Sequence, residues 1–353
     1  MAKLLPSFLP EYKYRGSIFN CGRQYGHEHA EGIAAQVADL AGFKPVQRKF
    51  AAACSRVKWK HGRLVESFIR GMGEASKQSY QDLYSFLCYE EMGRMKHCTG
   101  LAATGHGTVD GKPIIGENWD GVRRQYAWPT LMRLHADTAP ATLFYVSTPG
   151  LWSCAGINEW GMSLVWTSAA HYLRKKHTWA KVGVPTYALV AGVLACRTCK
   201  EAVELLRQTP NAGGFIFFIA DATGEAGVVE AVPHRTHYIQ CKDVLGRANH
   251  LESDEMVGYS RQHVGKSTPQ CNTLIRGVRI AKLLRQYRGK IDRAAVETML
   301  RDEKAPPGLT ICQSAANGNI CMTVDSFYCL PAKREFWIAR GLQTRHAYER
   351  HRI

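Results

Sequence analysis

The pattern of apolar residues changes after residue 97, and this change limits the folds that are open to the chain. Before it, apolar residues recur at helical spacing over residues 25–40 and again over 64–92. After it, short apolar runs come in pairs separated by turn residues, which is typical of antiparallel hairpins. Helical stretches interrupt these pairs at 186–208 and 274–302. Hairpins and separate long helices predict an α+β layered domain rather than a parallel βαβ array.

Paired strands are the main structural prediction for the second part of the chain. The first pair is separated by Asp110-Gly111, a dipeptide that strongly favours a tight hairpin turn. Residues 157–161 are predicted to form the turn of the second pair. The predicted pairs are 99–109 with 113–119, 142–147 with 162–167, 215–220 with 226–232, and 320–330 with 335–339.

The composition is that of an ordinary globular protein. The chain has 353 residues, of which 45% are hydrophobic and 22% charged, so disorder, collagen and coiled coil are excluded. No apolar run approaches the roughly 20 residues of a membrane span. The first residues lack the long apolar region of a secretory signal. We therefore expect a soluble, cytoplasmic protein with no membrane partner.

The formal net charge of +16 is spread along the chain rather than gathered in one block. No nucleic-acid-binding motif accompanies it, so no nucleic-acid partner is predicted. Spread charge of this kind is usually a solvated surface, and it is also compatible with an anionic or phosphate-bearing substrate. A non-enzymatic protein that binds a polyanion through its basic surface is the alternative that the charge leaves open.

Twelve cysteines in a chain of this length do not indicate a disulfide framework, so reduced and buried thiols are expected. Cys196 and Cys199 have the spacing of metal ligands, but no second pair follows them. Phosphate-binding and dinucleotide-binding glycine loops are also missing from the sequence. We therefore predict no metal and no cofactor.

Cys98 stands out among the cysteines because it begins the first predicted hairpin. If Asp110-Gly111 is the loop, Cys98 faces position 123, and Asp120 lies three residues away from that register. A bulge or a longer loop would absorb this offset. The hairpin then brings a thiol close to a carboxylate. The alternative is a small buried cysteine and a carboxylate that belongs to a turn.

Six short motifs follow one another in the order that is typical of one enzyme family. They are Tyr25-Gly26-His27-Glu28-His29, Cys98-Thr99, Gly116-Glu117-Asn118-Trp119-Asp120, Gly156-Ile157-Asn158, Gly183-Val184-Pro185 and Ala248-Asn249-His250. With these motifs the chain resembles the penicillin acyltransferase family of N-terminal-nucleophile hydrolases (acyl-CoA:6-aminopenicillanic acid acyltransferase-like, peptidase C45). The similarity spans most of the chain.

The resemblance implies a fold and a set of site residues. The fold is a four-layer αββα sandwich. The precursor cuts itself between His97 and Cys98, which leaves segments 1–97 and 98–353 within one structural domain. Cys98 is then the nucleophile, and Asp120 is the acidic residue that contacts it. Asn249 is the asparagine whose side-chain amide helps to form the oxyanion hole.

The resemblance also implies the reaction class. The enzyme is an acyltransferase or amide hydrolase that works through an acyl-cysteine. Its partners are a small-molecule acyl donor, with a CoA thioester among the candidates, and an amine or water as acceptor. The alternative within enzymes is a plain amidase of the choloylglycine or acid-ceramidase type, without acyl transfer.

Two positions depart from the family pattern. His97 stands where family precursors commonly have glycine, and its side chain either hinders the strained conformation of cleavage or assists proton transfer. Asn317 occupies the position of an active-site arginine in the penicillin-processing branch. The resemblance therefore does not imply β-lactam chemistry, and the acyl group stays open.

For some residues in and near these motifs, a purely structural role is also open. His250 follows Asn249, and adjacent residues of a strand face opposite ways, so we predict a structural role for His250. Trp152, Trp160, Trp166 and Trp179 either wall an acyl pocket or fill the core, as aromatic residues in hairpins usually do.

Overall fold

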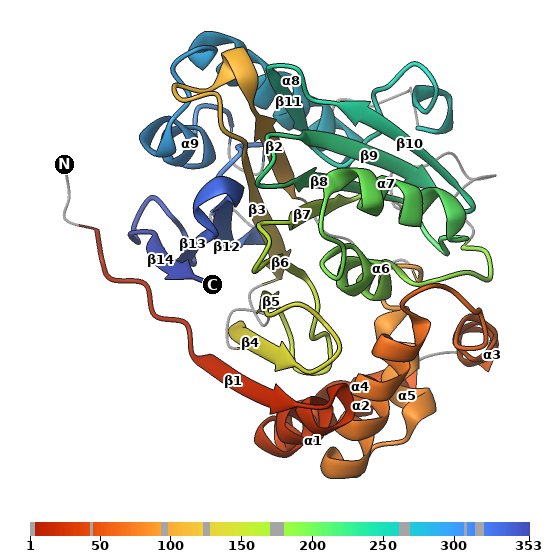
Figure 1. Ribbon diagram of the computed structural model, residues 1–353. Helices are drawn as coiled ribbons and strands as arrows, with labels where there is room; N and C mark the ends of the chain where they lie inside the picture. The colour runs from red at the N-terminus through yellow and green to blue at the C-terminus, as the bar shows by residue number, and fades with distance from the viewer. Residues whose placement is uncertain are drawn as a thin grey trace.

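Two β-sheets lie face to face, and helices cover their outer faces (Figure 1). The computed structural model describes residues 4–42, 45–92, 98–122, 128–169, 180–260, 269–306, 309–314 and 321–353. The two sheets touch where β3 (Ile114–Val122) contacts β7 (Ser163–Ser168) and β8 (Phe215–Ala220). The arrangement is an α+β, four-layer αββα sandwich, so the predicted fold class is confirmed.

The larger sheet contains strands from both sides of residue 97. β1, near the start of the chain, pairs with β4 in parallel, whereas the other neighbouring pairs among its described strands are antiparallel. The segment before the predicted cleavage point is therefore hydrogen-bonded to the segment after it. The spatial order is β1 (Glu11–Gly16), β4 (Thr130–Ala136), β5 (Thr142–Val146), β6 (Ala155–Asn158), β7, β8, β9 (Ala226–Val232) and β10 (Arg235–Gln240).

The smaller sheet is antiparallel and carries the first predicted hairpin at its centre. Its central strands are buried along nearly their whole length, because one face meets the larger sheet and the other meets helices. The spatial order is β11 (Val244–Arg247), β2 (Thr99–Ala103), β3, β12 (Cys321–Leu330), β13 (Glu335–Arg340) and β14 (Glu349–Arg352).

Helices α8 (Pro269–Tyr287) and α9 (Arg293–Leu300) cover the outer face of the smaller sheet. Apolar residues of both helices, among them Ile280 and Met299, form a separate buried cluster with residues of β2 such as Leu101. This packing makes α8 the helix that lies over the start of the first hairpin.

Helices α6 (Thr186–Val193) and α7 (Cys199–Gln208) lie against the larger sheet. Tyr187 of α6 packs edge-on against Trp166 of β7, with ring centroids 5.5 Å apart. The helices that precede residue 97 gather at one end of the molecule (Figure 1). They are α1 (Ile18–Glu28), α2 (Ala30–Asp39), α3 (Pro45–Cys54), α4 (Gly62–Ser76) and α5 (Tyr80–Leu87).

The predicted pairing of 215–220 with 226–232 is confirmed by β8 and β9, and that of 320–330 with 335–339 is confirmed by β12 and β13 within the described residues. The predicted pairing of 142–147 with 162–167 is wrong. β6 lies between β5 and β7 and pairs with both. This strand has only four residues, which is too short for alternation of apolar residues to reveal.

Three predicted long helices are each two helices, and a capping side chain begins the second helix in each case. α4 ends where Lys77 adopts a left-handed φ of 57°, and Oγ of Ser79 then accepts a hydrogen bond from the main chain of α5. Thr198 caps α7 and Asp292 caps α9 in the same way. The first predicted helix, 25–40, is likewise divided, between α1 and α2 at His29.

The eleven cysteines whose side chains the structure describes are buried, and none of these eleven forms a disulfide. The prediction that the thiols are buried is confirmed for them. No helix in the described part of the chain combines the length and the apolar character needed to cross a membrane.

Candidate active site

Cys98 lies directly before β2, and it is only 1% exposed. β2 pairs with β3 so that Thr99 lies opposite Asn118. The same register, continued by one residue, sets Cys98 opposite Trp119 and next to Asp120. The hairpin therefore brings Cys98 to the end of β3 that carries the carboxylate, as the sequence predicts.

The connection between β2 and β3 is longer than the dipeptide Asp110-Gly111. The strand pairing ends at Ala103, and the residues from there to Pro113 form the connection, which includes a 3-10 turn. The additional loop residues shift the register. The prediction that Cys98 faces position 123 is therefore wrong, and the shift favours contact with the end of β3 near Asp120.

A buried arginine, Arg276 of α8, joins Cys98 to Asn249. Its Nη1 donates to the main-chain oxygen of Cys98 and, over 2.6 Å, to Oγ1 of Thr99. Its Nη2 donates to Oδ1 of Asn249 over 2.6 Å, and its Nε donates to Oδ1 of Asn272 over 2.5 Å. The side chain is 0% exposed, so these oxygen atoms replace water around the guanidinium.

Sequence analysis did not single out Arg276, although a signal was present. Arg276 falls on the same helical stripe as Ile280 and Leu284, both of which are buried. A charged residue on the apolar face of a helix indicates a buried polar partner. The identity of the partners could not be read from the sequence, because Cys98 and Asn249 lie far from Arg276 along the chain.

Asn249 lies just after β11, and its side chain is fully buried. Its Oδ1 faces Arg276, whereas its Nδ2 donates to the main-chain oxygen of Ser168 over 2.8 Å. Its main-chain N donates to Oγ1 of Thr273 over 2.7 Å. These contacts fix the orientation of the amide. The Nδ2 group carries a second hydrogen that can stabilise a developing oxyanion.

Asp120 of β3 is 0% exposed and is held by two donors. Its Oδ1 accepts from Oγ1 of Thr323 over 2.7 Å, and its Oδ2 accepts from Nε2 of Gln313 over 2.9 Å. Burial raises the pKa of Asp120 to about 7, while the charge of Arg276 and the two hydrogen bonds act in the opposite direction. A carboxyl group that titrates near neutrality therefore lies beside the guanidinium.

The structure thus brings three predicted site residues, Cys98, Asp120 and Asn249, into one cluster around Arg276. His97 and Asn317 lie outside the described residues.

Two of the four tryptophans are core residues, since Trp152 and Trp166 are at most 1% exposed and belong to the main apolar cluster. Trp160 is partly buried, and Arg197 lies over its ring at 5.5 Å. Trp179 lies outside the described residues.

The described part of the chain contains no group of three His, Cys, Asp or Glu side chains placed to hold a metal ion. Nε2 of His29, in the first of the six motifs, lies 3.1 Å from Oη of Tyr14.

The sequence profile described as "Acyl-coenzyme A:6-aminopenicillanic acid acyl-transferase" matches residues 108–343, about two thirds of the chain. The chain belongs to this family. The match includes Asp120 and Asn249 and begins after Cys98. Membership confirms the resemblance drawn from the six motifs, and it places the protein among the acyltransferases and amide hydrolases of the N-terminal-nucleophile type.

Several solved structures are similar to this acyl-transferase family member at low identity. An N-acylethanolamine-hydrolyzing acid amidase ortholog from Caenorhabditis elegans has a TM-score of 0.47 and 14% identity, covering 67% of this chain and 93% of its own. A mutant conjugated bile acid hydrolase from Clostridium perfringens gives 0.41 and 14%, with coverage of 72% and 97%. Penicillin V acylase from Agrobacterium tumefaciens gives 0.42 and 16%, with coverage of 69% and 83%.

Similarities of this size add nothing to the family assignment, which rests on the sequence profile and the motifs. No curated protein sequence matches the chain.

Replacing Asp120 by asparagine is expected to change the pH dependence of stability. The folded-state pKa of about 7 exceeds the ordinary value of 3.8, so the folded protein holds this proton more tightly than the unfolded chain does. Stability from Asp120 is therefore fully present below about pH 4 and is lost as the pH rises to about 7, by at most about 4 kcal/mol. Relative to the parent, Asp120→Asn should gain stability over that interval.

Urea denaturation of both proteins between about pH 4 and pH 8 measures this difference. Both should carry Cys98→Ala, so that cleavage before residue 98 cannot complicate unfolding. Asp325, whose pKa burial also raises to about 7, is present in both and cancels in the comparison. A difference in stability that does not vary with pH would contradict the prediction.

Proposed function

We propose that this protein is a cysteine enzyme whose chain is cleaved between His97 and Cys98, and whose Cys98 then accepts the acyl group of the substrate as a thioester. The observation that supports this best is the placement of Arg276, which binds the main chain of Cys98 and the side chain of Asn249 at once. One rigid group then sets the distance between the nucleophile and the oxyanion donor, which acyl transfer requires.

Cleavage would supply the base as well as the nucleophile. A free α-amine has a pKa of about 8 and a thiol of about 8.5, so the amine of residue 98 can take the proton of its own thiol. The thiolate attacks the acyl carbonyl, and the ammonium then returns the proton to the departing amine or thiol. Water or a second amine releases the acyl group from sulfur by the reverse sequence.

The tetrahedral intermediate carries a negative charge on oxygen. The proposed donor is Nδ2 of Asn249, because Oδ1 of the same amide is held by Arg276 and cannot exchange places with it. The proposed role of Asp120 is to orient the ammonium of Cys98 and to balance the charge of Arg276. The guanidinium of Arg276 lies close enough to Asp120 to lower the pKa of its carboxyl group.

The two fragments, 1–97 and 98–353, are proposed to stay together after cleavage. Six residue pairs join β1 to β4 across the cleavage point. The side chain of Phe68 stacks on Trp152 with centroids 4.2 Å apart, and the main-chain N of Gly150 donates to Oη of Tyr25 over 3.0 Å. Contacts of this kind bury apolar surface on both fragments and do not depend on the peptide bond before Cys98.

The proposed substrates are small-molecule acyl donors, either amides or a CoA thioester, with an amine or water as acceptor. The family description names an acyl-coenzyme A donor and a 6-aminopenicillanic acid acceptor. The net charge of +16 is compatible with an anionic donor of this kind.

Mass spectrometry of the intact protein tests the proposal. Purified protein is expected to consist of two fragments that divide between His97 and Cys98. Incubation with octanoyl-CoA or an N-octanoyl amide, followed by an acid quench, should add one octanoyl group to the fragment that begins with Cys98. A full-length chain that hydrolyses these probes, or an adduct on another residue, would overturn the proposed mechanism.

The same assay separates an acyltransferase from a plain amidase. With octanoyl-CoA as donor, added amine acceptors are expected to yield N-octanoyl product at the expense of free octanoate. Free octanoate alone, at every acceptor concentration, would show an amidase or thioesterase without acyl transfer.

A further inference from the structure

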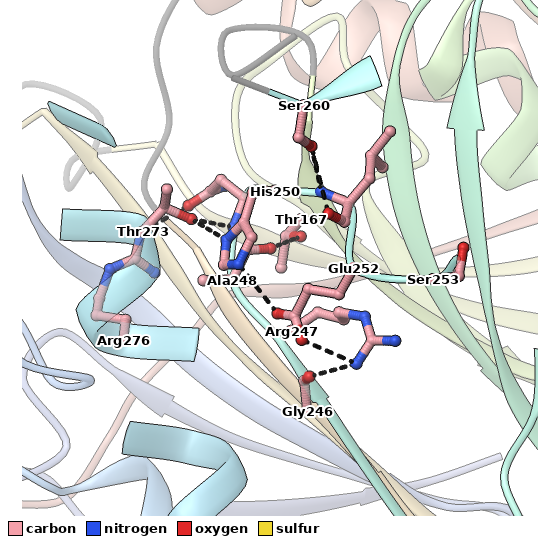
Figure 2. A network of polar contacts seen from close by, with 12 residues as sticks. Thr167, Gly246, Arg247, Ala248, His250, Glu252, Ser253, Ser260, Thr273 and Arg276 are labelled. Atoms are coloured by element: carbon pink, nitrogen blue, oxygen red, sulfur yellow. Dashed lines mark hydrogen bonds and ion pairs between the residues drawn. The ribbon is translucent and has the colours of Figure 1, made fainter. Parts of the chain in front are cut away.

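The hydroxyl group of Thr273 contacts both Asn249 and His250. Figure 2 shows Thr273 beside the ring of His250. The main-chain N of Asn249 donates to Oγ1 of Thr273 over 2.7 Å, and Nδ1 of His250 lies 3.0 Å from the same oxygen. Thr273 is 2% exposed and stands one turn before Arg276 on α8. One helix therefore contacts both the side chain and the main chain of Asn249.

Asn249 and His250 both reach Thr273 because neither residue is part of a strand. β11 ends at Arg247, and the chain bends at the two residues that follow Ala248. The sequence-based expectation treated Asn249 and His250 as neighbours in a strand, whereas the structure places both after the end of β11. The bend points the main chain of Asn249 and the ring of His250 toward the same hydroxyl.

The ring of His250 is tightly enclosed. A Cβ atom at Gly277 would lie only 2.8 Å from Cε1 of His250, so the glycine allows α8 to approach the ring. A glycine inside a helix costs about 1 kcal/mol relative to alanine, which makes a packing reason of this kind necessary. The position of His250 is therefore set by the helix that carries Thr273 and Arg276.

The far side of the ring faces a carboxylate. Nε2 of His250 lies 3.2 Å from Oε1 of Glu252, although the pair is not aligned as a hydrogen bond. The main-chain N of Glu252 donates to the buried carboxylate of Glu230, which also binds Nε of Arg247 over 2.7 Å. This network, part of which Figure 2 shows, holds the residues after Asn249 in place.

The charge state and the tautomer of His250 together set the direction of its hydrogen bonds. Burial, together with the positive charges of Arg276 and Arg247, lowers the pKa of His250 to about 4, so the ring is neutral at neutral pH. A neutral ring whose Nε2 hydrogen faces Glu252 has an Nδ1 that accepts. Thr273 has one hydroxyl hydrogen, which it then donates to His250 while its oxygen accepts from Asn249.

We propose that Thr273 and His250 are positioning residues. His250 orients the hydroxyl of Thr273, and this hydroxyl fixes the main chain of Asn249. The side-chain amide of Asn249 is thereby aimed at the oxyanion. This inference rests on the proposed function, because Asn249 has this task only if Cys98 forms a tetrahedral intermediate. Arg276 and Ser168 hold the amide itself, and Thr273 holds the backbone from which it extends.

Thr273→Val and Thr273→Ser form the matched pair that tests this role. Valine keeps the shape and removes the hydroxyl, whereas serine keeps the hydroxyl. We measure two rates at Cys98: acylation by 4-nitrophenyl octanoate, which passes through an oxyanion, and alkylation by iodoacetamide, which does not. Thr273→Val is expected to slow acylation about 10- to 100-fold and to change alkylation by less than about 2-fold. Thr273→Ser should restore acylation to within about 3-fold of the wild type.

Thr209→Val is the control for loss of a buried hydroxyl. Oγ1 of Thr209 donates to the main-chain oxygen of Leu205 over 2.6 Å, and the residue is 6% exposed. It follows the last residue of α7, a helix that contacts α6 and β10, whereas Cys98 precedes β2 in the other sheet. We expect Thr209→Val to lower thermal stability by an amount similar to that of Thr273→Val and to leave both rates at Cys98 unchanged.

His250→Leu and His250→Asn test the hydrogen bond between His250 and Thr273. Asparagine can place an acceptor where Nδ1 lies, and leucine cannot. His250→Leu should slow acylation more than alkylation, and His250→Asn should recover part of the loss.

Equal acylation rates in Thr273→Val and the wild type would overturn the inference, and so would a parallel loss of acylation and alkylation, which indicates general disorder of the site. A wild type that gains no acyl group on Cys98 from 4-nitrophenyl octanoate would overturn the proposed function and this inference with it. If Cys98 is acylated and Thr273→Val leaves the acylation rate unchanged, only the inference about Thr273 is overturned, and the proposed function stands.

Discussion

Cys98→Ala is expected to leave the chain at its full length and to lower the rate of N-acyl amide hydrolysis by at least about 10³-fold. The reason is that both proposed covalent steps, cleavage before residue 98 and acylation, use the same sulfur atom. The residual rate would come from the amide of Asn249, which can still stabilise charge on the carbonyl oxygen although no nucleophile stands beside it. Intact mass and product release, measured on the same preparation, check both losses together.

Cys241→Ala is the matched control. Cys241 is also buried, and burial raises the pKa of its thiol to about 12, so it does not form a thiolate near neutral pH. We expect this variant to be cleaved and acylated like the wild type. If Cys98→Ala retained hydrolysis while Cys241→Ala lost it, the assignment of the nucleophile would be wrong.

Arg276→Met is expected to lower both stability and activity, each by a large amount. Methionine fills much of the same volume but leaves the oxygen atoms of Cys98, Thr99 and Asn249 buried without their donor. Removing one partner of a buried charged network typically costs about 3–5 kcal/mol of stability. The rate should fall by about 10²- to 10³-fold in protein that remains folded, because the amide of Asn249 is then free to turn.

Urea denaturation and the acylation rate of Cys98 measure these two effects. Arg279→Met is the control on the same helix. Arg279 pairs with Asp302 over 2.6 Å but keeps a side chain that is 20% exposed, so its loss should cost about 1 kcal/mol and leave the rate unchanged. Equal effects of the two substitutions would mean that Arg276 has no special relation to Cys98.

Arg276→Lys is expected to recover little of the loss. Lysine carries the charge but has a single ammonium group, which cannot reach the main chain of Cys98 and the amide of Asn249 together. A variant with normal activity would show that charge alone is sufficient at this position, and the proposed geometric role would be wrong.

Local sequence patterns were sufficient for the elements whose signals lie within a few residues. The hairpin of β8 and β9 has two apolar runs around a turn, and the hairpin of β12 and β13 has the same pattern, so both were predicted with nearly correct bounds. Ser79, Thr198 and Asp292, which cap α5, α7 and α9, are local signals too, although the helix predictions ran through them and joined two helices in each case. These features depend on interactions between close neighbours in the chain.

Predictions failed where a distant segment decides the outcome. The pairing predicted for β5 and β7 was wrong because the short β6 enters between them. β1 joins the larger sheet in parallel beside β4, although more than a hundred residues separate the two strands. Strand order depends on which surfaces bury each other in three dimensions, and the spacing of residues along one strand does not encode this.

The sequence by itself determined the layered α+β class and the family, and it singled out Cys98, Asp120 and Asn249 as candidate site residues. Motifs carry that information because each chemical group needs a particular residue type with particular neighbours. Only the tertiary structure showed that Arg276 and Thr273 of α8 bind these motifs. Their partners are close in space but distant along the chain, and a hydrogen bond depends on the position of its atoms in the folded molecule.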